Sequence, residues 1–143
     1  MERMHRARRF LARSPLERRL LLCAVVSHLA AWGLVRIVRF GALRRWQARV
    51  VQRVASPRGD AARERAVLWA AATAAALMPF GHHCLPAAVN AQWLLLLTCG
   101  RRTAMRIGVA SLPGRAFTAH AWLESDGRAV FGAPEPSPFL PLR

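Results

Sequence analysis

Residues 117–132 read FTAHAWLESDGRAVFG. Side chains suited to a strand alternate before the Asp126-Gly127 pair, and a second short run of strand-forming residues follows it. Asp-Gly between two such runs is typical of a two-residue β-hairpin turn. The stretch therefore predicts two antiparallel strands, over Phe117–Ser125 and Arg128–Gly132.

The segment that precedes this hairpin predicts another strand and an apolar helix. Thr103–Ala110 (TAMRIGVA) has the composition of a strand. Cys84–Thr98 (CLPAAVNAQWLLLLT) forms a helix in which Pro86 is tolerated because it falls in the first turn. Gly100 ends this helix, and Cys84 would lie at its N-terminus.

Helices are predicted throughout the N-terminal half of the chain. Ser14-Pro15-Leu16-Glu17 has the residues of a capping box and starts a helix that runs to about Trp32, where Gly33 softens or ends it. A strongly basic amphipathic helix is predicted over 34–55, and an alanine-rich helix is expected over Ala61–Leu77. Helices first and an antiparallel sheet second define an α+β fold.

The length of the chain, 143 residues, leaves room for one compact domain. We divide it into a basic helical region over 1–60 and a core over 61–143, which together form one compact unit. The core includes a tail with prolines at 134, 136, 138 and 141, which we expect to be extended and irregular.

The charge of the chain is strongly positive, with 22 Lys and Arg residues against 7 Asp and Glu residues, a net charge of +15. Such a surface favours anionic partners and phospholipid headgroups, although no nucleic acid is expected. The 54% apolar content makes a small basic integral membrane protein without catalysis one alternative. Against it, the uncharged run 20–35 is shorter than the ~20 residues a spanning helix needs, and prolines and polar residues interrupt the uncharged run 66–100.

The three cysteines, Cys23, Cys84 and Cys99, lack Cys-x-x-Cys spacing. They do not form a disulfide framework or a zinc finger, and they indicate a reducing, cytoplasmic compartment. Neither a metal nor a cofactor is expected. His82 and His83 stand beside Cys84, but adjacent side chains diverge on a turn and lack the spacing of zinc ligands.

Cys84 is a candidate nucleophile because a helix N-terminus stabilises a thiolate, and its unpaired N–H groups can hold an oxyanion. The base would be His120, in the middle of a predicted strand, where alternation places it on one face with Trp122 and Glu124. The alternative is a buried structural thiol, which lone cysteines more often are. Spacing alone leaves both interpretations open.

The run from Cys84 to Gly132 resembles the protease domain of lasso-peptide biosynthesis B proteins, the microcin-processing leader peptidases. The resemblance lies in the C-L helix start, the I-G-V strand and the segment A-H-A-W-x-E-x-D-G-R. These proteins are related to the transglutaminase and papain-like cysteine protease fold. The resemblance implies that Cys84 is the nucleophile and His120 the general base and acid of a hydrolase that removes the leader from a ribosomally made precursor.

The family's third catalytic residue, an Asp on the strand after the hairpin turn, has no counterpart here. In a regular hairpin His120 lies opposite Ala133, with Gly132 next to it. Asp126 is about 20 Å from His120 at ~3.3 Å per residue and is more simply a turn former, whereas Glu135 lies on the same face two positions beyond Ala133. Otherwise a backbone carbonyl, an Asn or Gln from elsewhere, or water must fix the imidazole tautomer. A catalytically weak member of the fold that acts as a binding module is the third alternative.

The resemblance also implies partners, namely the precursor peptide, a separate leader-binding protein and the ATP-dependent macrolactam cyclase. Some members carry a leader-recognition domain ahead of the protease, but the first 80 residues here are predicted to be helical, so we expect a stand-alone protease. The basic segment 36–53 would dock the partner, an acidic leader or a membrane surface, or would simply be solvated. The expected location is the cytoplasm, with membrane association left open.

Overall fold

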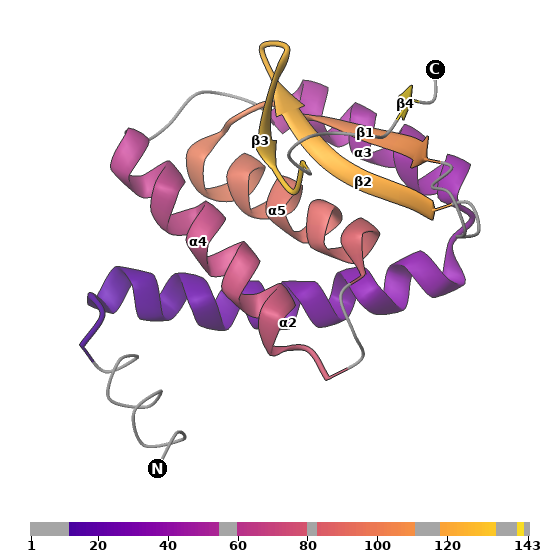
Figure 1. Ribbon diagram of the computed structural model, residues 1–143. Coiled ribbons are helices and arrows are strands. Elements are labelled where there is room, and N and C mark those ends of the chain that lie inside the picture. The colour runs from indigo at the N-terminus through magenta and orange to yellow at the C-terminus, as the bar shows by residue number, and fades with distance from the viewer. Residues whose placement is uncertain (1–11, 55–59, 80–82, 111–117, 134–139, 142–143) are drawn as a thin grey trace.

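The computed structural model describes residues 12–54, 60–79, 83–110, 118–133 and 140–141. In this part of the chain, helices come first and an antiparallel sheet second, with the strand order β3-β2-β1-β4 (Figure 1). The predicted α+β class is confirmed. The elements are α2 (Pro15–Ile37), α3 (Phe40–Val54), α4 (Ala61–Leu77), α5 (Cys84–Cys99), β1 (Ala104–Ala110), β2 (Thr118–Ser125), β3 (Arg128–Phe131) and β4 (Leu140–Pro141).

Helix α2 begins with the predicted capping box, since the Ser14 side chain accepts from the Glu17 N–H and the Glu17 carboxylate accepts from the Ser14 N–H. The prediction that this helix ends near Trp32 is wrong, because α2 continues to Ile37. Residues 34–37 therefore belong to α2, and the predicted basic helix over 34–55 begins only at Phe40, as α3. A helical glycine costs about 1 kcal/mol relative to alanine. Burial of the flanking segment against α3 and α5, with Ala31 fully buried, outweighs that cost.

Helix α5 lies between the sheet and the α2–α4 pair (Figure 1). Because it is covered on several sides, its buried residues are not confined to one stripe. Ala121 and Leu123 of β2 belong to the same apolar cluster as α2, α4 and α5, so this face of the sheet packs on the helices. The core thus holds the start of α5 in a defined position relative to β2.

A buried polar contact joins α5 to α2. The Asn90 side chain is fully buried, and its Nδ2 donates to the Ala24 carbonyl at 3.1 Å. The Ser27 hydroxyl lies at hydrogen-bond distance from Asn90 Oδ1. Buried polar groups require such partners, so this contact selects one rotation of α5 about its axis. That rotation in turn sets the direction of the first residues of α5.

The hairpin between β2 and β3 has the predicted two-residue turn but is not regular. Leu123 pairs with Phe131, where a regular ladder would pair it with Val130. Strand β3 therefore holds one extra residue, as in a β-bulge. Beyond this point the prediction that Ala133 lies opposite His120 is wrong, because the bulge moves the register by one residue.

Strand β4 returns the chain to the edge of the sheet, where Leu140 pairs with Val109 and Pro141 with Gly108. The prediction of an irregular tail is wrong for these two residues, and 134–139 lie outside the described residues. Proline is tolerated at this position because an edge strand need not donate on its outer side. The division of the chain at residue 60 stays a prediction.

Helix α2 has the length and apolar content of a membrane-spanning helix, with 23 residues and a mean hydropathy of 1.9 in its most apolar window. A core helix of a soluble protein and an N-terminal signal sequence share these properties. One face of α2 is buried against α4 and α5, while Leu22, Val26 and Leu29 are exposed. The fold is therefore compatible with a soluble and with a membrane-associated protein.

Candidate active site

Cys84 is the first residue of α5. His83 precedes it as the N-cap with an extended backbone, and it makes no side-chain capping hydrogen bond. The first N–H groups of a helix have no partner within the helix, and Pro86 has none to donate. The N–H groups of Cys84 and Leu85 thus lie next to the thiol at the positive end of the helix dipole.

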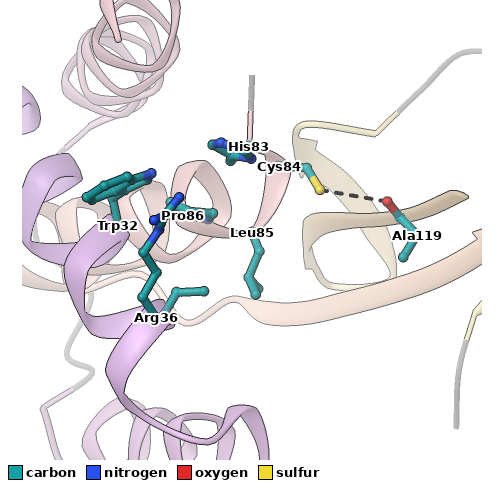
Figure 2. A pocket seen from close by; sticks show the side chains of 8 residues that line it. Trp32, Arg36, His83, Cys84, Leu85, Pro86 and Ala119 are labelled. Atoms are coloured by element: carbon teal, nitrogen blue, oxygen red, sulfur yellow. Dashed lines mark hydrogen bonds between the residues drawn. The ribbon is translucent and has the colours of Figure 1, made fainter. Parts of the chain in front are cut away.

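The Cys84 side chain is half-buried and points toward the edge of β2 (Figure 2). Its thiol donates a weak hydrogen bond to the Ala119 carbonyl oxygen, with an Sγ–O distance of 3.9 Å. Ala119 directly precedes His120 on β2. Cys84 therefore lies against the residue that precedes His120 on β2. Ala121 packs on the helices, so the alternation of β2 places His120 on the other face of the strand from Ala119 and Ala121.

The His120 imidazole is held by the main chain that follows β3. Its Nε2 donates to the Gly132 carbonyl oxygen over 2.5 Å. Because a carbonyl oxygen only accepts, Nε2 carries a proton in this hydrogen bond. Gly132 has φ +75, and a Cβ there would lie 3.6 Å from the Ala121 carbonyl, so its backbone runs close to β2. A backbone carbonyl was one of the alternatives left open for the third catalytic group.

The ring of Trp122 stacks beside the imidazole, with centroids 6.4 Å apart and an interplanar angle of 18°. Trp122 is 5% exposed, and its Nε1 donates to the Glu124 carboxylate at 2.9 Å. The hydrogen bond from Trp122 and a second one from Arg106 lower the pKa of Glu124 below its usual value. His120, Trp122 and Glu124 therefore form a continuous series of contacts along one face of β2.

Of the two further candidates from the sequence, only Asp126 is among the described residues, and it is not near the imidazole. Asp126 lies in the turn at the opposite end of β2, with its side chain 91% exposed and 3.8 Å from Arg101. Glu135 lies outside the described residues, so its position stays a prediction. Among the residues that the structure describes, no three His, Cys, Asp or Glu side chains gather as metal ligands would.

A surface pocket of about 350 Å³ opens in front of Cys84 (Figure 2). Its wall opposite β2 comes from the last turns of α2, where the Arg36 guanidinium lies 3.9 Å from the centroid of the Trp32 ring. Sequence reasoning missed this wall because it ended the helix at Gly33. The spacing of Trp32 and Arg36, four residues apart, was the available signal. The lining residues are Trp32, Val35, Arg36, His83, Cys84, Leu85, Pro86 and Ala119.

These groups together suit nucleophilic acyl transfer. A thiol at a helix start, main-chain donors beside it, an imidazole and an open pocket are the components that such chemistry needs. Hydrogen bonds between a nucleophile and its base are often loose before substrate binds.

Comparison with known proteins identifies a family for this chain. A family model described as Transglutaminase-like superfamily matches residues 24–143, which covers most of the chain and includes Cys84, His120 and Gly132. Such a fold is typical of cysteine peptidases and is also found in transferases. No curated protein and no solved structure gives a significant match.

Proposed function

The chain belongs to the transglutaminase-like superfamily, and from that premise we propose that it is a cysteine peptidase that removes the leader from a ribosomally made lasso-peptide precursor. The observation that carries the peptidase activity is the position of Cys84 at the start of α5, beside the strand that bears the tethered His120. The choice of a leader peptide as substrate rests on the resemblance of the segment AHAWLESDGR to leader peptidases.

The proposed reaction begins when His120 Nδ1 accepts the proton of the Cys84 thiol. The thiolate attacks the scissile carbonyl carbon, and the carbonyl electron pair moves to oxygen, where the N–H groups at the start of α5 stabilise it. The imidazolium then gives its proton to the leaving amine nitrogen as the C–N bond breaks, which leaves a thioester on Cys84. Water, deprotonated by His120, attacks the thioester and releases the acid and the free thiol.

In this proposal the Gly132 carbonyl orients His120, the role that a carboxylate has in other members of the family. In a catalytic triad the third group holds the imidazole in one tautomer and one orientation. A carbonyl that accepts from Nε2 meets both requirements, although it brings a partial and not a full negative charge. The hydrogen bond between His120 and Gly132 supports this assignment.

The proposed partners are the precursor peptide, a separate leader-binding protein that delivers it, and the ATP-dependent cyclase that acts on the product. The proposed location is the cytoplasm, with contact at a membrane surface. The charge of +15 supports contact with an acidic leader or with anionic lipid.

A small integral membrane protein is the second candidate, favoured by the length and apolar content of α2. Cell fractionation separates the two. A peptidase at a membrane surface is released by salt or carbonate, whereas an integral protein is recovered only in detergent.

The test is incubation with the precursor and the leader-binding protein, followed by mass spectrometry of the products. Wild type and Cys23→Ala, a matched change of an exposed cysteine on α2, are expected to release the leader. Cys84→Ala and His120→Ala are expected to release none. Cleavage by Cys84→Ala, or no cleavage by wild type with both partners present, overturns the proposal, and precursor binding without cleavage identifies a binding module.

A further inference from the structure

The pocket in front of Cys84 is lined by basic and by apolar side chains. Among the described residues that line it, Arg36 and His83 are basic, and none is acidic. Its volume of about 350 Å³ falls within the ~300–1,000 Å³ of sites that bind small ligands or parts of larger ones. The apolar part of the lining comes from Trp32, Val35, Leu85 and Pro86.

The Arg36 guanidinium has no carboxylate partner in the described part of the chain. The carboxylates that form ion pairs among the described residues all pair with other arginines. The ion pairs are Arg13–Glu17, Arg101–Glu64, Arg101–Asp126 and Arg106–Glu124. The charge of Arg36 is therefore unneutralised at the pocket.

The Trp32 ring restricts the orientation of this guanidinium. A guanidinium that lies over an aromatic face, here 3.9 Å from the ring centroid, presents its N–H groups around the edge of the stack. This geometry suits a bidentate hydrogen bond with a carboxylate. Figure 2 shows Trp32 and Arg36 on one side of the pocket and Cys84 with Ala119 on the other. A carboxylate held by Arg36 is thus separate from the carbonyl that Cys84 would attack.

We propose that Arg36, oriented by Trp32, is a substrate-recognition residue that binds a carboxylate close to the bond that is cut. The substrate is then a peptide with an acidic residue beside the scissile bond, whose side chain enters the pocket. This inference deepens the proposed function and rests on Cys84 as its nucleophile. A peptide C-terminal carboxylate has the same chemistry, so the test separates the two sources.

The test uses reagents that label Cys84 without hydrolysis of a peptide bond. Bromoacetyl-Ala-Glu-amide, bromoacetyl-Ala-Gln-amide and bromoacetyl-Ala-Gln with a free C-terminal carboxylate differ only in the presence and position of a carboxylate. In each case the thiolate displaces bromide and forms a thioether. Tandem mass spectrometry of the digested full chain measures the labelling rate at Cys84 separately from Cys23 and Cys99.

We expect wild type to react about 5- to 10-fold faster with the Glu reagent than with the Gln amide. In Arg36→Gln this ratio falls to about 1. In Arg39→Gln, an equal change of charge on an exposed residue outside the pocket lining, it is retained. An unchanged rate with the neutral Gln amide reports that each variant is folded. Faster labelling by the C-terminal acid would assign the site to a chain end.

Equal rates for acid and amide reagents in wild type would overturn the proposal. So would an equal loss of the preference in Arg36→Gln and Arg39→Gln, because that result indicates only the overall positive field. The readout is alkylation, so a chain that cleaves no peptide but keeps the Arg36-dependent preference refutes the peptidase and not the carboxylate site.

Discussion

Replacement of Gly132 by alanine tests whether a main-chain carbonyl orients His120. Gly132 and Gly127 belong to the same hairpin and have nearly equal left-handed φ angles, +75 and +74. An L-residue in that region costs roughly 1–2 kcal/mol. A Cβ at Gly127 meets nothing within 4 Å, and one at Gly132 meets the Ala121 carbonyl at 3.6 Å, an ordinary contact. Gly127→Ala is therefore a matched control for the backbone strain.

The two variants differ in which peptide group the backbone strain displaces. At residue 132, relief of the positive φ rotates the peptide plane that carries the oxygen bonded to His120 Nε2. A hydrogen bond to a group that becomes charged contributes about 1.5–3 kcal/mol. The imidazole takes up a proton during the reaction. If the hydrogen bond to the imidazolium is lost, kcat/KM should fall by about 10- to 150-fold.

The assay measures kcat/KM for leader removal and the free energy of unfolding in urea for wild type, Gly127→Ala and Gly132→Ala. Both variants are expected to lose about 1–2 kcal/mol of stability, while only Gly132→Ala loses activity. Equal kcat/KM values for the two folded variants would refute the role of the carbonyl.

Three further predictions concern the scaffold. Asn90→Ala removes the buried contact with Ser27 and leaves a cavity, so urea unfolding should show a loss of about 2–3 kcal/mol, with a smaller loss for Ser27→Ala. Ser14→Ala deletes the N-cap of α2 and should lower the free energy of unfolding by about 1 kcal/mol, with no change in Cys84 labelling. Burial, and secondly the charge of His83, lowers the pKa of His28. The unfolded chain then binds that proton more readily, so stability is complete above about pH 6.5 and falls below it. Urea unfolding between pH 5 and 8 should show a weaker acid loss in His28→Gln, and identical slopes would contradict the assignment.

Several helices could be predicted because their end signals are local. Asp60 accepts from the Arg63 N–H at the start of α4, and the bounds Ala61–Leu77 agree with the prediction. The end of α2 could not be predicted in this way. Gly33 is a genuine local stop signal, and what overrides it is packing against α3 and α5, which are distant along the chain.

In the candidate site, too, features marked by local patterns could be predicted, and features set by distant packing could not. Cys84 and His120 became candidates from a helix start and an alternating strand, which are local patterns, and their catalytic roles were implied by the resemblance to leader peptidases. The Gly132 contact depends on a bulge that shifts the register by one residue, and no local signal marks it. The pocket wall with Arg36 depends on the true length of α2, so an error in one helix boundary concealed the residue that we propose for recognition.

The hydrogen bond from His120 to a main-chain oxygen bears on how inactive relatives are recognised. A chain is commonly judged catalytically dead when one of its expected catalytic side chains is missing. Here the acceptor is a backbone carbonyl oxygen. Every residue has such an atom, so only the path of the backbone decides whether it lies at the imidazole. The lack of the family's Asp at the expected sequence position is therefore not sufficient to class this chain as a pseudoenzyme. In such chains the path of the backbone after the hairpin, more than the identity of the side chain, decides whether the third group is present.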